Sequence, residues 1–359
     1  MSAPVPHVLV TLPHGVPAAG PAHLMAVKTH HRSSEEAGSA FGSASGVFHN
    51  LPRPGMVTAR WLRKLLLPAP AAAQRQGRAG AGEKHAFRNG GRAMRIDAHV
   101  HISPEEGFVE RLLEEERRLG FDKVCLNGAV WFDWQDGNAA VKAAMEKYPE
   151  AVIGFAYFPL GELGADKVRE LADQGFRGLK FIRPPARYDD HQFYPVYSVA
   201  EQLQLVCLFH TGIVARTPED GERDVNNERH RPICLDTIAR AFPHLNIIGA
   251  HLGNPWYEEA AMSCRWNPNL YFDLSGSSLK RHQPEFFKSA LWWTETTLYR
   301  DPEGRHAWRK IVFGSDVSIE FIEDVVQDYQ RTMDAIGLSP ELQQAVFGGT
   351  MASLLGLEK

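Results

Sequence analysis

The sequence is poor in several features that define whole classes of protein. Its 359 residues contain four cysteines and no Cys-x-x-Cys pair. Cys125 and Cys207 lie inside apolar runs typical of buried strands, so the spacing indicates reduced core thiols and not a disulfide framework or a structural zinc site. No apolar run is long enough to span a bilayer. A Gly-x-Gly-x-x-Gly turn after the first strand, the usual sign of a dinucleotide-binding sheet, is also absent.

The formal net charge of −4 conceals an uneven distribution of charge. Residues 1–93 carry 11 Lys and Arg against 3 Asp and Glu, a balance of +8, so the remainder carries 28 against 40, a balance of −12. An acidic main portion has no general affinity for nucleic acid or anionic membranes. We therefore expect a cytoplasmic protein with neither of these partners, and a homo-oligomer stays open.

Residues 1–93 are rich in Ala, Gly, Pro and Arg and show few sustained apolar periodicities. Such a composition buries too little apolar surface to offset the entropy of ordering, which predicts a mostly disordered tail. A basic stretch followed by apolar residues near 60–73 resembles a weak targeting signal, but Pro68 and Pro70 interrupt it. Because Met94 would be a natural translation start, we favour a disordered or spurious N-terminal extension over a targeting signal.

From Met94 onward, short β-rich runs alternate with longer helical patterns, which is typical of parallel α/β architecture. Most of the runs are almost continuously apolar, as expected for strands that are buried on both faces. We predict eight strands, over residues 95–102, 123–129, 152–158, 178–182, 205–211, 246–252, 270–275 and 311–315.

Helical patterns fill the gaps between the predicted strands. Eight such βα units in about 265 residues match the usual size of a (β/α)8 TIM barrel, which we predict for residues 94–359. A doubly wound open sheet is the alternative, but it lacks its glycine-rich turn. The predicted helices cover roughly 104–119, 138–148, 162–174, 194–203, 230–242, 282–298 and 320–336, with a less clear one at 255–265 and a final stretch at 339–356.

Polar residues that can bind metal stand where four of the predicted strands end. The first strand ends in His99 and His101, whose side chains face the same side because residues two apart in a strand share a face. His210, His251 and Asp316 end the fifth, sixth and eighth strands. Since the carboxyl ends of barrel strands form the catalytic face, these five residues predict a metal centre there.

Each of these residues taken alone has a simpler interpretation. A single His-x-His is a weak signal, and an isolated His210 or His251 is more often a hydrogen-bonded core residue. Asp316 alone could cap a following helix that begins near 317–320. Five such residues at four strand ends are improbable by chance, and this coincidence favours the metal centre.

The resemblance to a known family rests on these strand ends taken together. The motifs are IDAHVH at 96–101, GFRGLK at 175–180, LFHTG at 208–212, GAHLG at 249–253 and FGSD at 313–316. As a set they resemble the amidohydrolase superfamily, and in particular its amidohydrolase-related branch, which includes enzymes similar to aminocarboxymuconate-semialdehyde decarboxylase. The closing segment 348–357 resembles the terminal helix of that family, although Thr350 and Met351 depart from the usual Gly-Asn-Ala. The resemblance covers residues 94–357.

The resemblance implies one divalent ion, most often Zn²⁺ with Mn²⁺ as the alternative, held by His99, His101, His210 and Asp316. Neutral imidazoles suit zinc, and a carboxylate completes a site that still has room for water. The ion lowers the pKa of a bound water toward ~7. His251 would then be the general acid or base, or the group that polarises the substrate.

Lys180, Arg183 and Trp131 are candidate substrate contacts. In binuclear members of the superfamily a carboxylated lysine on strand four bridges two ions, whereas a free Lys180 would line the barrel and contact a substrate carboxylate; we favour one ion. Arg183 could clamp a carboxylate, and Trp131 could form a wall for a planar substrate; solvation and packing are the simpler interpretations. We expect Asp97 to point away from the barrel interior and to orient a neighbouring loop.

Three functions remain as hypotheses. The leading one is a metal-dependent hydrolase that attacks a C–N or C–O bond of a small molecule, such as an amide or lactone, through a metal-bound hydroxide, with Asp316 as the proton shuttle. The second is a metal-dependent, non-oxidative decarboxylase of an aromatic or muconate-type acid. The third is a barrel without catalysis that serves as a binding or scaffold protein, against which the complete set of five residues argues.

Overall fold

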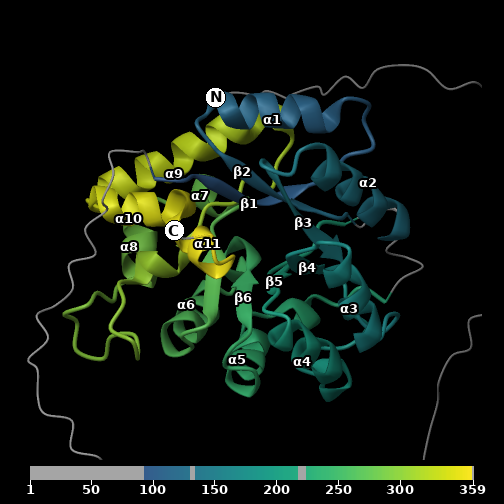
Figure 1. The fold of residues 1–359 in the computed structure, drawn as a ribbon. Helices are drawn as coiled ribbons and strands as arrows, with labels where there is room; N and C mark the ends of the chain where they lie inside the picture. The colour runs from purple at the N-terminus through teal and green to yellow at the C-terminus, as the bar shows by residue number, and fades with distance from the viewer. Residues whose placement is uncertain (1–92, 130–133, 217–223, 358–359) are drawn as a thin grey trace, which may run out of the picture. The chain divides into compact units, whose positions relative to one another are not determined.

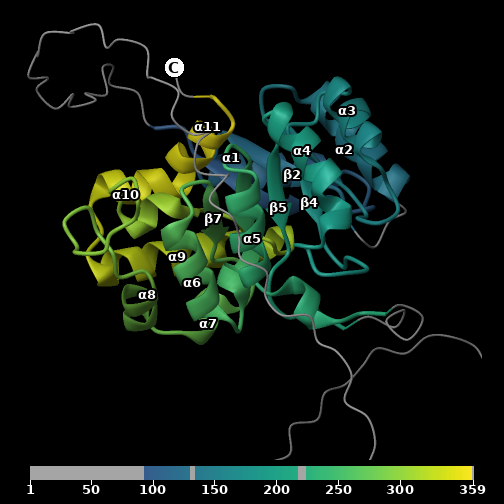
Figure 2. The same ribbon diagram turned by 90° about the horizontal axis from the view of Figure 1, so that it is seen from below.

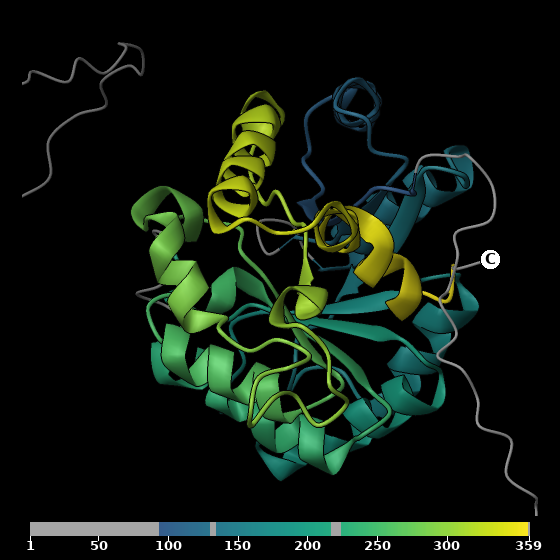
Figure 3. The same ribbon diagram turned by 90° about the vertical axis from the view of Figure 1, so that its left-hand side faces the viewer.

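Eight parallel strands in the order β1 to β8 form one sheet, and helices lie around it in a computed structural model of the chain (Figures 1 and 3). The structure describes residues 93–129, 134–216 and 224–357. The chain divides into two units, residues 1–83 and 84–359, and the barrel belongs to the second. The predictions for residues 1–92 and for Trp131 fall outside the described residues.

All eight predicted strands are confirmed, each within a few residues of its predicted bounds. Neighbouring strands pair in sequence order without a reversal, so the doubly wound alternative is wrong. The strands are β1 Ile96–His101, β2 Lys123–Asn127, β3 Val152–Tyr157, β4 Gly178–Phe181, β5 Val206–Phe209, β6 Asn246–Gly249, β7 Leu270–Asp273 and β8 Ile311–Val312.

Among the described residues, no helix combines the length and the apolar character that a membrane crossing requires.

Most of the predicted helices are confirmed as well. The helices are α1 Phe108–Arg118, α2 Trp134–Lys147, α3 Ala165–Asp173, α4 Tyr194–Gln202, α5 Ile233–Ala241, α6 Tyr257–Trp266, α7 Ser278–Arg281, α8 Pro284–Ala290, α9 Ile322–Ile336, α10 Pro340–Gln344 and α11 Thr350–Leu354, with a π-helical segment at Ala345–Gly349.

The helix predicted over 282–298 is wrong in its length. Its first part is α8, which Pro284 begins at a position where a proline is favoured and which ends at Ala290, and the short α7 lies before it. Beyond α8 the backbone is not helical, because Thr294 N donates to Thr297 Oγ1 at 3.0 Å and threonine hydroxyls compete with helical bonding. Trp293 is nevertheless fully buried in the core between the barrel and its helices.

The edges of the sheet are joined by backbone hydrogen bonds between β1 and the segment after β8. Ala98 N donates to Phe313 O at 2.9 Å, and Asp316 N donates to His99 O at 2.8 Å. Figure 1 accordingly shows α1 and α9 side by side, although they come from opposite ends of the barrel sequence, and Arg118 of α1 pairs with Glu323 of α9. The eight strands thus form a nearly closed barrel.

The apolar core has two parts, one outside the strands and one inside the barrel. The outer part lies between the strands and the surrounding helices, among which α5 and α6 lie next to each other (Figure 2) and are joined by a bond from Asn267 Nδ2 to Asp236 Oδ1 at 2.6 Å. The inner part fills the starting end of the barrel, where α11 covers it. Its strand residues include Ile96, Ala98, Cys125, Phe155, Val206, Leu208, Ile248 and Val312, and Met351 and Leu354 come from α11.

Candidate metal centre

A cluster of ionisable side chains occupies the carboxyl ends of the strands, above the apolar filling. His99 and His101 extend from β1 and Lys180 from β4, while His210 follows β5 by one residue. Asp273 ends β7. His251 and Asp316 stand beyond the ends of β6 and β8, in the turns that lead into the next elements.

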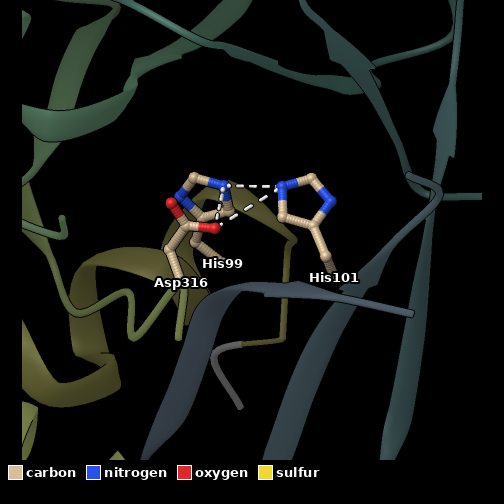
Figure 4. A group of neighbouring side chains, drawn as sticks. All are labelled: His99, His101 and Asp316. Carbon is tan, nitrogen blue, oxygen red and sulfur yellow. Dashed lines mark hydrogen bonds and ion pairs between the residues drawn. The ribbon is translucent and has the colours of Figure 1, made fainter. Parts of the chain in front are cut away.

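The tightest group in this cluster consists of His99, His101 and Asp316, whose ring nitrogens and carboxylate oxygen turn toward one another (Figure 4). The two Nε2 atoms are 3.3 Å apart, and Asp316 Oδ1 lies 3.5 Å from His99 Nε2 and 3.6 Å from His101 Nε2. Such atoms, all within 4.8 Å of one another, could hold a metal ion.

The hydrogen bonds on the far side of both rings determine which nitrogen faces the cluster. His101 Nδ1 lies 3.0 Å from Gly128 O, and His99 Nδ1 lies 2.9 Å from Asp273 Oδ2. A carbonyl and a carboxylate only accept, so both Nδ1 atoms carry a proton and the Nε2 atoms are the ones turned toward the cluster. Burial, with the charge of Lys180, lowers the pKa of His101 to about 3, which keeps its ring neutral. Two imidazole Nε2 atoms and a carboxylate form a ligand set that fits a divalent cation such as zinc.

His210 and His251 form a second pair beside this group. His251 Nε2 lies 3.6 Å from Asp316 Oδ2 and 3.3 Å from His210 Nδ1. His210 is outside the three-residue group, and its Nε2 is buried without a hydrogen-bond partner among the described residues. The nitrogen that His210 turns toward His251 is Nδ1 and not Nε2. The role of His210 as a metal ligand stays a prediction.

Lys180 lies inside the barrel and points at the same place. Its side chain is fully buried and its Nζ lies 2.8 Å from His99 Nε2. Burial lowers the pKa of Lys180 to about 8. The ammonium group therefore contacts the lone pair that His99 would give to a metal ion, and its predicted role as a substrate contact remains a prediction.

A β-bulge turns the two histidines of β1 toward the interior. Ile96 and Ala98 face inward, and strict alternation would then direct His99 outward. The register of β1 against β2 shifts between Asp97 and Val100, which reverses the alternation. Asp97 stabilises this bulge, because its Oδ1 accepts from His99 N at 2.9 Å and from the backbone nitrogen of Ser315 at 3.1 Å.

Four residues at the mouth of the barrel adopt the left-handed backbone conformation that non-glycine residues rarely occupy. Their φ angles are 62° for His251, 46° for Leu252, 48° for Asp316 and 53° for Arg183. Such strain persists only where the surroundings enforce it, and it concentrates at functional sites. Asp316 does not cap the next helix, since Ser318 occupies the position before the turn Ile319–Phe321.

The predicted substrate contacts are less well defined than the metal centre. Arg183 donates from its backbone nitrogen to His230 Nε2 at 3.0 Å and from its guanidinium to Ala215 O at 3.2 Å. His230, which the sequence analysis did not single out, packs edge-on against the ring of His210. Trp131 lies outside the described residues, so a converging arginine and aromatic wall remain predictions.

Asp273 is a site residue that sequence reasoning missed. It lies within the seventh predicted strand, fully buried, with Oδ2 on His99. A signal for it existed, because Asp273 stands at a carboxyl strand end like the other polar residues. Asp273 lies in an apolar segment that contains no histidine, so the sequence pattern does not indicate its contact with His99 of β1.

Comparison with known proteins agrees with this geometry. The profile of the family described as amidohydrolase matches residues 96–357. The chain belongs to the amidohydrolase family. The resemblance drawn from the strand-end motifs is thus confirmed, whereas a search of curated proteins finds no match.

Solved structures with the same fold include proteins that are named for different activities. A 5-carboxyvanillate decarboxylase from Sphingomonas paucimobilis is 14% identical with a TM-score of 0.52, covering 74% of this chain and 99% of its own. A putative 2-pyrone-4,6-dicarboxylic acid hydrolase from Pseudomonas putida is 18% identical with a TM-score of 0.52, covering 75% and 99%. A dihydroxybenzoic acid decarboxylase from Polaromonas with bound manganese is 15% identical with a TM-score of 0.53, covering 75% and 98%. At these identities the likeness shows the fold alone.

Proposed function

We propose that this protein is a metal-dependent hydrolase that cleaves a C–N or C–O bond of a small amide or lactone. The observation that carries the proposal is the position of His251 Nε2, 3.6 Å from Asp316 Oδ2 and beside the two histidines of β1. Hydrolysis needs a group that takes a proton from water beside the reacting carbon, and the proximity of these two acceptors to the proposed metal ligands supports that role.

His99, His101 and Asp316 would hold the ion, with His210 as the fourth ligand. A divalent cation held there, which we expect to be zinc, would supply polarisation of the scissile carbonyl and a lowered pKa of a neighbouring water. Burial lowers the pKa of His251, so its ring is neutral near neutral pH and can accept a proton at Nε2. His251 would then return that proton to the leaving nitrogen or oxygen, which balances the reaction.

Decarboxylation of an aromatic or muconate-type acid is the second candidate, because two of the similar structures carry that activity in their names. Replacing a carboxylate by hydrogen requires a proton at carbon, and His251 could deliver there a proton that it had taken from water. Lys180, Arg183 and Trp131 would hold a carboxylated substrate in either reaction.

Metal content and a matched activity screen test the proposal. The full chain is loaded with zinc or manganese, its metal is counted by elemental analysis, and amides, lactones and aromatic acids are assayed for hydrolysis and for CO2 release. We expect hydrolysis that chelation abolishes and zinc restores. Full activity after removal of the metal would exclude the mechanism, CO2 release would select the decarboxylase, and a chain that binds no metal would point to the scaffold.

A further inference from the structure

We propose that Asp273 and Ser275 are positioning residues that hold His251 as its Nδ1–H tautomer, so that its Nε2 lone pair faces the metal centre. The geometric part of this inference stands by itself, while its effect on turnover rests on the proposed function. It adds two residues to the site that none of the strand-end motifs includes, and it assigns separate tasks to the two oxygens of one carboxylate.

The hydroxyl of Ser275 joins the carboxylate to the imidazole. Ser275 Oγ lies 2.5 Å from Asp273 Oδ1 and 2.9 Å from His251 Nδ1. A hydroxyl has one proton to donate, and a contact of 2.5 Å between a hydroxyl and a carboxylate requires that proton to lie between them. Ser275 Oγ is therefore an acceptor toward His251, and His251 Nδ1 must carry a proton.

Asp273 Oδ1 accepts hydrogen bonds from the groups around it. It accepts from His251 N at 2.8 Å and from Ser275 N at 3.0 Å, as well as from the Ser275 hydroxyl. Because two backbone N–H groups already donate to this oxygen, the proton between it and Ser275 belongs to the hydroxyl, which therefore donates to Asp273 and accepts from His251.

The backbone at Gly276 passes close to the imidazole of His251. Gly276 has a φ of 71°, and a Cβ atom there would lie 3.0 Å from His251 Nδ1. A side chain at position 276 would therefore press on the ring edge that meets Ser275. Among the described residues, His251 Nδ1 has one hydrogen-bond partner, which is the hydroxyl of Ser275.

Mutation can separate the effects of the two Asp273 oxygens. Oδ2 fixes the tautomer of His99, a proposed metal ligand, whereas Oδ1 acts on His251 through Ser275. Removal of the Ser275 hydroxyl should thus affect proton transfer without affecting metal binding. Removal of the Asp273 charge should affect both.

The experiment compares Ser275→Ala and Ser275→Thr with the unaltered zinc-loaded chain. Long-range ¹⁵N–¹H spectra of histidine-labelled protein distinguish Nδ1–H from Nε2–H rings, and a His251→Gln sample assigns the signal of His251. We expect the Nδ1–H signal of His251 to be lost in Ser275→Ala and kept in Ser275→Thr, with kcat lowered about 10- to 100-fold in the alanine variant alone. Zinc per chain should be unchanged in both.

Two further variants serve as controls. Ser263→Ala removes a buried hydroxyl from α6, outside the site, and should change neither the spectrum nor kcat. Asp273→Asn should weaken zinc binding as well as turnover, which separates the effects of the two oxygens.

An unchanged His251 signal in Ser275→Ala overturns the relay, and so does an altered signal with an unchanged kcat. If the signal responds as expected but no hydrolysis of any amide or lactone is found in the unaltered chain, the assigned tautomer stands and the proposed function fails.

Discussion

The two halves of the barrel interior are built from the same strands but from opposite kinds of side chain. Near the starts of the strands the interior is apolar, with Phe155, Leu208 and Ile248 among its members. Near the carboxyl ends it contains His99 and Lys180, both almost fully buried and bound to other polar groups. One or two residues along a strand separate the two environments.

The half of the barrel that stabilises the fold and the half that contains the proposed metal centre therefore follow one another along the strands. The apolar half gains free energy from burial and close packing, and it needs no particular chemical group. Burial of the polar half costs desolvation free energy, which its internal hydrogen bonds offset. The same hydrogen bonds orient the lone pairs of its side chains. Substitutions in the first half should therefore change the free energy of unfolding, and those in the second should change metal binding and turnover.

The largest effect is expected from Phe155→Ala in the apolar half. The Phe155 ring is fully buried and packs over Gly178, where an added Cβ would lie 2.5 Å from its Cε2. We expect the free energy of unfolding to fall by about 3–5 kcal/mol in urea titrations. Phe321→Ala is the control, since that ring is 51% exposed and should cost less than about 1 kcal/mol. Equal losses for both variants would remove the distinction between the halves.

His101→Asn probes the polar half at the metal centre. It removes one of the three converging donors, so zinc per chain should fall and kcat/KM should drop by more than about 100-fold, or about 2.7 kcal/mol. The unfolding midpoint of the metal-free protein should change little. His244→Asn, at an exposed histidine, is the matched control. Full zinc occupancy in His101→Asn would show that the ion binds at another place.

Lys180→Met tests the boundary between the halves. The ammonium group contacts His99 Nε2 and repels a cation there, so we expect zinc to bind about tenfold more tightly in competition with a chromophoric chelator, or about 1.4 kcal/mol. The opposite result, weaker binding together with a mass that corresponds to a carboxylated lysine in the unaltered chain, would make Lys180 a ligand and favour two ions.

Ile248→Val should have the smallest effect. It removes one methylene from the apolar half at a fully buried position on β6. We expect a loss of about 0.5–1.5 kcal/mol in the free energy of unfolding, with zinc affinity and turnover unchanged. A change in zinc affinity without a change in stability would mean that packing in the lower half controls the site.

The sequence predicts the fold well because each strand is an apolar run between helical patterns, a signal carried by neighbouring residues. The strand-end rule likewise brings His99, His101 and Asp316 together, although nothing local relates residues so far apart. The helix predicted over 282–298 fails in its second half, because apolar spacing alone does not register the hydrogen bond from Thr294 N to the Thr297 hydroxyl that follows α8.

Other parts of the site depend on contacts that only the folded chain makes. The bulge in β1 is stabilised when Asp97 accepts from Ser315, 218 residues away, and no local pattern encodes that bond. The role of Asp273 depends on its bond to His99 across the barrel. Long-range hydrogen bonds of this kind determine tautomers and side-chain directions, which sequence periodicity does not contain.

Because the bulge in β1 reverses the alternation of the strand, the length of this segment is constrained as tightly as its composition. Loss of one residue between Asp97 and Val100 would restore regular pairing with β2 and would direct either the apolar residues before the bulge or the histidines after it to the wrong side. Many side-chain exchanges are compatible with the barrel at this strand, whereas insertions and deletions are not. An evolutionary or engineered path that moves the metal centre to another strand must therefore transplant the irregularity of the backbone along with the two histidines.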